Sequence, residues 1–182
     1  MAAQFVLILG GARSGKSHYA EKLAAEFGPH VLYVATAEAG DEEMVRRIEF
    51  HRQVRPSTWQ TLEAPRHVGS ALATVGSRPD VILLDCLTLL VSNIVLALEA
   101  EGPEAMEEAL QAEVESLLAA QADLAVPLIA VSNEVGLGLV PPYPLGRIYR
   151  DMLGWANQRL AAEADKVLFM AAGLPLILKD NL

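Results

Sequence analysis

Cysteine is almost absent from the sequence. Cys86 is the one cysteine among 182 residues, so an intramolecular disulfide is impossible and the paired cysteines of zinc-binding motifs are missing. Such a composition is typical of proteins that work in a reducing compartment. We therefore expect a cytoplasmic protein without a disulfide framework.

Long apolar runs and an excess of positive charge are also missing. No stretch reaches the roughly 18 uninterrupted apolar residues of a membrane-spanning helix, and the N-terminal "MAAQFVLILGG" has no basic segment ahead of its short apolar run. The 14 Lys and Arg residues against 23 Asp and Glu residues give a net charge of −9. This charge argues against nucleic acid or an anionic membrane as a partner, and favours a small-molecule substrate.

The sequence does contain a series of short runs rich in Val, Ile and Leu. They are nearly continuous rather than alternating, which is typical of strands buried on both faces of a parallel sheet. Five runs are clear and the last is weaker: 4–9, 30–35, 81–86, 126–132, 166–172 and 174–178.

Helical patterns separate these runs. An apolar face over 19–27 ends at Gly28-Pro29, and further helices are expected over 87–101, 103–123 and 145–164. The helix after Thr88 is apolar nearly all round, so we expect it to be buried and to leave surface for a subunit contact. Alternating strands and helices over a length that suits one core predict a single three-layer α/β domain spanning residues 1–182, with a mostly parallel central sheet.

The strongest motif follows the first strand. The stretch "GGARSGKS" matches the P-loop pattern G-x-x-x-x-G-K-[ST] and opens a helix, as the mechanism of phosphate binding requires. Its backbone N–H groups are expected to cradle phosphates, its lysine to bridge the β and γ oxygens, and its serine to bind Mg²⁺. The predicted nucleotide contacts are Gly10, Gly11, Ala12, Arg13, Ser14, Gly15, Lys16 and Ser17, with the adjacent His18.

A second magnesium contact is expected from Asp85, at the carboxyl end of the run "VILLD". Because Lys16, Ser17 and Asp85 must converge on one ion, we predict that the strand over residues 4–9 lies next to the strand over residues 81–85. The pattern as a whole predicts a P-loop NTPase fold of the RecA-like kind.

A histidine between two arginines marks the segment 41–55. Asp41 is a plausible helix N-cap and Pro56 a stop signal, and the expected helix places Arg47, His51 and Arg55 on one stripe at i, i+4 and i+8. Neighbouring cations favour a neutral imidazole, which can attack phosphorus, while arginines attract phosphate. Spacing alone leaves open the alternative of a solvated basic helix face.

Taken together, these stretches resemble the bifunctional adenosylcobinamide kinase / adenosylcobinamide-phosphate guanylyltransferases of cobalamin assembly. The resemblance covers nearly the whole chain and lies in seven segments: 10–17, 33–37, 41–48, 51–63, 82–88, 132–141 and 157–165. In that family a histidine shortly before an Arg-Pro pair carries covalent GMP. The matching residue here is His51, with Arg55-Pro56 in register.

The resemblance implies two reactions: phosphorylation of adenosylcobinamide by ATP or GTP with Mg²⁺, and transfer of GMP from GTP to the phosphorylated corrinoid. It also implies a homo-oligomer, a trimer. The stretch 132–144 follows a predicted strand end and is rich in Gly and Pro, which favours a corrinoid-side or active-site loop over the alternative of an ordinary structured loop. The nucleotide contacts that the resemblance implies, besides the P-loop and Asp85, are Ala35, Thr36, Ala37, Arg52, Gln53, Val54, Arg55 and Glu63. We interpret Glu63 as an acceptor for the guanine N–H edge. Phe50 departs from the family, which often has a polar residue before the nucleophile.

Two other functions compete with this interpretation. One is a monofunctional P-loop kinase in which His51 only holds phosphate. The other is a GTP-dependent switch protein, which is disfavoured because the guanine-reading motif N-K-x-D of such switches is missing, the nearest string being "SNEV" at 132–135.

Overall fold

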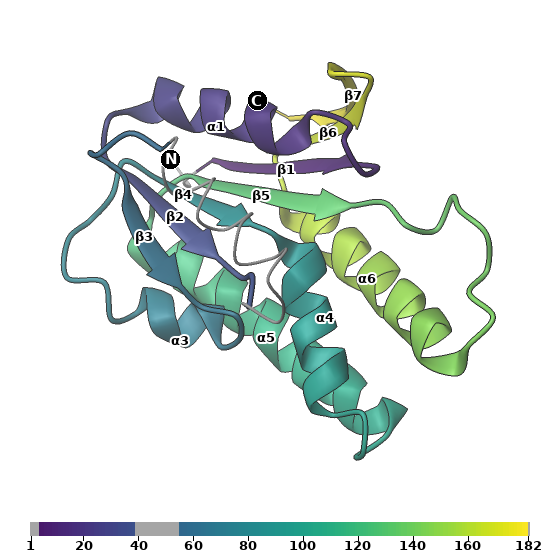
Figure 1. Cartoon of the computed structure of the whole chain (residues 1–182). Helices are drawn as coiled ribbons and strands as arrows, with labels where there is room; N and C mark the ends of the chain where they lie inside the picture. The colour runs from purple at the N-terminus through teal and green to yellow at the C-terminus, as the bar shows by residue number, and fades with distance from the viewer. Residues whose placement is uncertain (1–3, 39–54, 182) are drawn as a thin grey trace.

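The strands form one sheet with all but its last strand parallel. The computed structural model describes residues 4–38 and 55–181, and within them seven strands are ordered β3-β2-β4-β5-β1-β6-β7 (Figure 1). Only the β6–β7 pair is antiparallel. The strands are β1 (Phe5–Gly10), β2 (Val31–Ala35), β3 (Gln60–Glu63), β4 (Val81–Asp85), β5 (Leu128–Asn133), β6 (Lys166–Ala171) and β7 (Leu174–Asp180).

Helices cover both faces of this sheet. In Figure 1, α1 lies on one face, and the other described helices lie on the opposite face. The helices are α1 (Lys16–Phe27), α3 (Val68–Leu72), α4 (Leu87–Ala97), α5 (Pro103–Leu124) and α6 (Pro144–Glu163). The expected three-layer α/β architecture is therefore confirmed.

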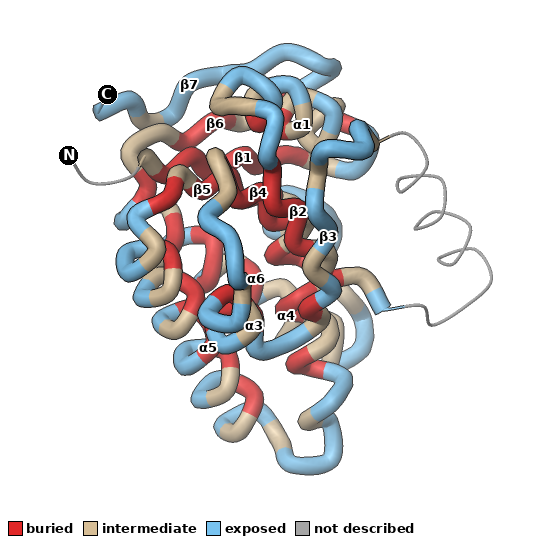
Figure 2. Tube along the Cα trace, turned by 90° about the vertical axis from the view of Figure 1, so that its left-hand side faces the viewer, coloured by how far each residue is buried: buried red, intermediate tan, exposed pale blue. Residues whose placement is uncertain are grey.

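Side-chain alternation along each strand divides the core into two layers. On β1, Val6 and Ile8 pack with Ala20 and Ala24 of α1, whereas Leu7 and its neighbours on the same face belong to the larger cluster beneath α4, α5 and α6. Figure 2 shows the inner strands as buried and the outer turns of the helices as exposed. Burial on both faces explains why the sequence shows continuous apolar runs.

The predicted contact between the first strand and the strand over residues 81–85 is wrong. β5 lies between β1 and β4 and pairs in parallel with both of them. The expectation assumed that Lys16 and Asp85 could meet only if their strands were neighbours. Parallel strands all end at the same edge of the sheet, however, so two residues at that edge can converge across an intervening strand.

The run 174–178 does form a strand, but not a buried parallel one. β7 is the antiparallel edge strand, and Leu174, Leu176, Ile177 and Leu178 are all exposed (Figure 2). The sequence also gave no signal for β3 or α3. β3 reads "QTLE" with three exposed residues, and α3 has only five residues, so neither carries an apolar period.

In the described part of the chain, no helix has the length and apolar character needed to cross a membrane. The helix after Thr88 was expected to be buried, and α4 does bury Leu90, Val91, Ile94 and Val95. Leu96 is the large apolar side chain that α4 leaves exposed.

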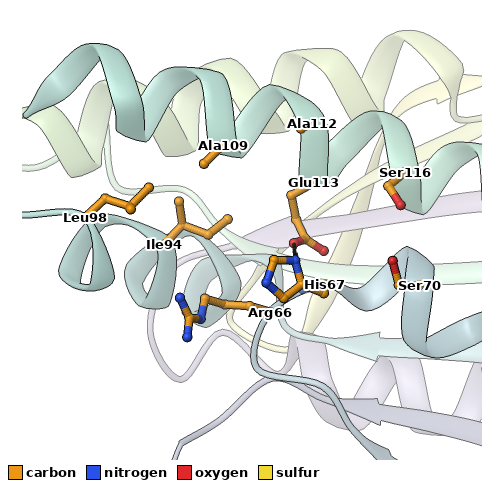
Figure 3. Close-up of a pocket in the computed structure, with 9 residues that line it drawn as sticks. All are labelled: Arg66, His67, Ser70, Ile94, Leu98, Ala109, Ala112, Glu113 and Ser116. Carbon is orange, nitrogen blue, oxygen red and sulfur yellow. Dashed lines mark hydrogen bonds and ion pairs between the residues drawn. The ribbon is translucent and has the colours of Figure 1, made fainter. Parts of the chain in front are cut away.

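A buried carboxylate fixes the turn that connects β3 to α3. The backbone N–H groups of His67 and Val68 donate to Glu113 of α5, at 2.7 Å to Oε2 and 2.6 Å to Oε1. The Glu113 side chain is only 4% exposed. Figure 3 shows it at the wall of a hollow of about 360 Å³ that Ile94 and Leu98 of α4 line on the opposite side. Both carboxylate oxygens are thus used to hold the turn.

Removing this carboxylate should destabilise the fold. Glu113→Ala leaves the buried N–H of Val68 and the part-buried N–H of His67 unpaired, so we expect the free energy of unfolding to fall by about 1–3 kcal/mol in urea unfolding. Glu113→Gln keeps one acceptor oxygen and should lose less. Glu108→Ala, at an exposed position on the same helix, is the matched control and should stay within about 0.5 kcal/mol of the parent chain. Equal losses for Glu108→Ala and Glu113→Ala would contradict this role.

Candidate active site

The P-loop connects the end of β1 to the start of α1, as the sequence predicts. A Cβ atom on Gly10 would lie 2.6 Å from Ser14 Oγ and 2.7 Å from the carbonyl oxygen of Met170, so only glycine fits there. Gly15, directly before α1, has a φ of 91°, a left-handed conformation that glycine adopts without steric cost. Both glycines are therefore needed to turn the chain into the helix.

Hydrogen bonds within the loop leave one buried donor unused. The N–H of Ser14 donates to Gly11 O at 3.3 Å, and the N–H of Gly173, in the β6–β7 turn, donates to Ser14 O at 2.9 Å. Ser14 Oγ, in contrast, is buried and has no hydrogen-bond partner among the residues described. A buried hydroxyl without a partner is uncommon. An oxygen of a bound phosphate would satisfy it.

Lys16 folds back over the loop that precedes it. Its Nζ donates to Gly11 O at 3.1 Å. Burial lowers the pKa of Lys16 below its ordinary value, because the ammonium loses part of its hydration, while the negative charge of Asp85 opposes this fall. Lys16, at the start of α1, and Asp85, at the end of β4, lie at the same edge of the sheet. An anionic ligand would supply the opposite charge that a half-buried lysine lacks.

Asp85 is joined to Arg55 through the ring of Tyr33. The Tyr33 hydroxyl donates to Asp85 Oδ2 at 2.8 Å, and the Arg55 guanidinium carbon lies 3.4 Å from the centroid of the Tyr33 ring. Burial raises the pKa of Tyr33 well above its usual range, and Asp85 adds to this shift, so the phenol remains a hydrogen-bond donor. Through Tyr33, the positively charged guanidinium of Arg55 is thus held close to Asp85.

The ends of β2 and β4 are tied together by Thr36. Its Oγ1 donates to Cys86 O at 2.7 Å and accepts from Cys86 N at 2.8 Å. Asn93 of α4 donates from Nδ2 to Thr36 O at 2.8 Å and to Pro65 O at 2.9 Å. Because Pro65 follows β3, these bonds connect the ends of β2, β3 and β4.

The comparisons with known proteins agree with this geometry. Residues 6–178 match the family described as cobinamide kinase / cobinamide phosphate guanyltransferase. The chain belongs to this family. It is 47% identical over 175 residues to the bifunctional adenosylcobalamin biosynthesis protein CobP of Pseudomonas aeruginosa, covering 96% of this chain and 97% of the relative.

Other members of the cobinamide kinase / guanyltransferase family are nearly as similar. The CobU protein of Salmonella typhimurium is 42% identical and that of Escherichia coli 39%, each over 180 residues that cover 96% of this chain and 99% of the relative. Both carry the name bifunctional adenosylcobalamin biosynthesis protein. The chain is therefore an enzyme of a kinase and guanyltransferase family, as the resemblance in its sequence implies.

A solved structure supports the fold assignment. The KaiC-like protein PH0186 of Pyrococcus horikoshii superimposes with a TM-score of 0.50 at 16% identity, over 98% of this chain and 80% of its own. This likeness concerns the fold alone. It agrees with the RecA-like P-loop fold that the sequence predicts.

Most of the site residues expected in this kinase / guanyltransferase chain lie at one edge of the sheet. Ala35 on β2 is the register partner of both Glu63 on β3 and Asp85 on β4, and Glu63 is exposed. Arg13 and His18 are exposed beside the P-loop. The predicted nucleophile and the three residues after it, His51, Arg52, Gln53 and Val54, lie outside the residues that the structure describes.

The sequence analysis missed the polar residues that support this edge. Tyr33, Asn93, Thr88 and Asn157 bind main-chain or side-chain groups at the ends of β2, β4 and β5. Tyr33 was hidden in an apolar run, and the others lie within helices. Strand parity offered one usable signal, because Tyr33 stands two residues before Ala35 on the same face as the site.

The single thiol gives a direct probe of this edge. Burial raises the pKa of Cys86 to about 11. At pH 8 the thiolate fraction is then about 250-fold below that of a free thiol of pKa near 8.5, and the greater nucleophilicity of a more basic thiolate recovers about tenfold of this. We expect the native chain to react with a disulfide reagent at least about tenfold more slowly than the urea-unfolded chain. Equal rates would contradict the raised pKa of the Cys86 thiol.

Proposed function

We propose that this chain catalyses both reactions that the family's description names. It phosphorylates adenosylcobinamide with ATP or GTP, and then transfers GMP from GTP, through a GMP-histidine intermediate on His51, to give adenosylcobinamide-GDP. The observation that carries the proposal is the packing of Arg55 on Tyr33, which in turn binds Asp85. This packing attaches Arg55, four positions after His51, to the edge of the sheet where Asp85 lies.

The covalent chain limits how far the nucleophile can stand from this edge. Arg55 is four residues along the chain from His51, and four extended residues span at most about 14 Å. A triphosphate held on the P-loop extends over a similar length. One bound nucleotide is therefore within reach of both the P-loop and the imidazole, as a bifunctional site requires.

In the kinase step, the P-loop holds the phosphates while the corrinoid's hydroxyl attacks the γ-phosphorus. A bond forms between that oxygen and phosphorus, and the bond to the β–γ bridging oxygen breaks, which leaves ADP or GDP. Lys16 and the loop N–H groups balance the charge on the phosphate oxygens. Catalysis here consists of positioning and charge stabilisation.

The side chains proposed to hold Mg²⁺ are Ser17 at the start of α1 and Asp85 at the end of β4. Tyr33 donates to Oδ2 of Asp85, and we assign the metal contact to the other carboxylate oxygen. Among the described residues, no three His, Cys, Asp or Glu side chains form a metal site. This fits an ion that takes its remaining ligands from phosphates and water. When bound, Mg²⁺ neutralises developing charge on the phosphate oxygens.

In the second reaction, a nitrogen of the neutral His51 imidazole attacks the α-phosphorus of GTP. The nitrogen–phosphorus bond forms and pyrophosphate leaves. A phosphate oxygen of the phosphorylated corrinoid then displaces the imidazole, which makes the pyrophosphate linkage of adenosylcobinamide-GDP and restores the histidine. The nucleotide contacts proposed for this step are those of the P-loop with Ala35, Thr36, Ala37, Arg52, Gln53, Val54, Arg55 and Glu63.

Two substitutions should show which residue both reactions share and which residue only one of them uses. Lys16→Ala removes a charge on the triphosphate, so both activities should fall by about a hundredfold or more. His51→Ala removes only the nucleophile, so it should keep a substantial fraction of the kinase rate and form little adenosylcobinamide-GDP. Each step is assayed separately, with adenosylcobinamide and with its phosphate as substrate. If His51→Ala kept normal guanylyl transfer, the GMP group would not pass through His51, and the mechanism would be contradicted.

We also propose that the chain acts as one domain over 1–182, in the cytoplasm, and assembles into a homotrimer. The helix after Thr88 was expected to offer the contact, but α4 buries most of its apolar residues. β7 is a better candidate, because its exposed apolar side chains extend along a free sheet edge.

Charge on β7 should disrupt this assembly. The double variant Leu176→Lys and Leu178→Lys places two charges on the exposed edge strand, so we expect it to sediment as a monomer at micromolar concentration, while the parent chain sediments as a trimer. Leu139→Lys, at a position that is 97% exposed, adds a charge elsewhere and should leave the trimer intact. A parent chain that sediments as a monomer would refute the assembly.

A further inference from the structure

Asn133 occupies the centre of the candidate active site. It is the last residue of β5, the strand that separates β1 from β4. In the parallel ladder it is the register partner of Gly10, the first residue of the P-loop, and it stands two residues beyond Val131, the register partner of Asp85. The residue therefore lies between the phosphate-binding loop and the acidic group.

Strand parity places Asn133 on the same face of the sheet as the P-loop helix. Ile129 and Val131 pack in the core layer beneath α1, whereas Ser132 binds Asn157 of α6 on the opposite face, with its Oγ donating to Oδ1 at 2.7 Å. Alternation assigns Asn133 to the α1 layer. Asp85 belongs to that layer by the same rule, since Leu83 of β4 packs there.

Two helices hold the main chain of Asn133 firmly. Its N–H donates to Thr88 Oγ1 of α4 at 2.8 Å, and its carbonyl oxygen accepts from Asn157 Nδ2 of α6 at 3.0 Å. Both main-chain groups are thus bound by side chains. These bonds hold the Cα atom of Asn133 in place, so its side chain has a defined position. Accurate positioning of this kind is needed in a catalytic group.

The side chain, in contrast, has an unused acceptor. Asn133 Oδ1 is buried and has no hydrogen-bond partner in the described part of the chain. Leaving a buried acceptor unpaired costs about 1–3 kcal/mol, and such atoms are rare in folded proteins. An alanine or leucine here would avoid the cost. A bound ligand with a donor group would also satisfy this oxygen.

We propose that Asn133 is a catalytic residue of the kinase step. Its side-chain amide contacts the acceptor: Oδ1 accepts the hydrogen bond of the alcohol and holds that oxygen in line with the γ-phosphorus. The amide is not a base, so the alcohol's proton passes to phosphate or water as the new oxygen–phosphorus bond forms and the bridging bond breaks. This inference rests on the proposed kinase activity and adds a residue to it.

The test is to measure the kinase rate, nucleotide affinity and thermal stability of Asn133→Ala together. We expect kcat with adenosylcobinamide to fall by about a hundredfold, the dissociation constant for the nucleotide to change by less than about threefold, and Tm to stay level or rise, because an unpaired acceptor is lost. GMP transfer to the phosphorylated corrinoid, which uses the α-phosphorus and not the alcohol, should persist.

Two further variants distinguish catalysis from support of the fold. Ser132→Ala, at the neighbouring residue on the opposite face, should lower Tm through loss of its bond to Asn157 and leave kcat within about threefold. Asn133→Asp has the same shape but carries a charge, so its kinase rate should be low at pH 8 and recover partly near pH 4, where an aspartate carboxyl group is about half protonated.

The outcomes against the proposal are specific. If Asn133→Ala keeps kcat within about threefold of the parent chain, or loses nucleotide affinity and Tm in parallel with kcat, then Asn133 has no catalytic role. A parent chain without any kinase activity would overturn the proposed function and this inference with it. An active parent chain with an unimpaired variant overturns this inference alone.

Discussion

Parallel pairing of β4, β5 and β1 is the constraint on which the site depends. It brings the carboxyl ends of these strands to one edge, and with them the P-loop, Asp85 and Asn133. Burial lowers the pKa of Lys16 at this edge, and the negative charge of Asp85 opposes this fall. In parallel sheets, ligands bind at this edge because loops and helix N-termini meet there. The chemistry of the site follows from that placement.

A second dependence links the two proposed reactions. Arg55 packs on Tyr33, and Tyr33 binds Asp85, so the segment that ends in the Arg-Pro pair is attached to the phosphate-binding edge by named contacts. Phosphoryl transfer and guanylyl transfer act on different phosphorus atoms of a triphosphate. A chain that holds the nucleotide once and presents two acceptors to it needs no second nucleotide site.

Much of this arrangement was predictable from local sequence signals. Apolar runs located β1, β2, β4, β5 and β6 within a few residues, and the P-loop pattern located the start of α1, because burial on both faces and a glycine turn leave clear marks. β3 and α3 were missed since both are short and carry no apolar period. The predicted pairing of β1 with β4 was wrong because the order of strands in a sheet depends on contacts between segments that are distant in sequence. Asn93 and Asn133 matter through partners that are distant in sequence, so no local pattern reveals them, and strand parity is the only local signal for Tyr33.

The central claim is that one nucleotide site serves both the P-loop and His51. The most direct measurement is to incubate the chain with GTP labelled at the α-phosphate, denature it and locate the label by peptide mapping. The account predicts a covalent label on His51 that is labile in acid and stable in base, as a nitrogen–phosphorus bond requires, and no label from γ-labelled GTP. A chain that acquires no α-label, or that carries it on a residue other than His51, would contradict the account.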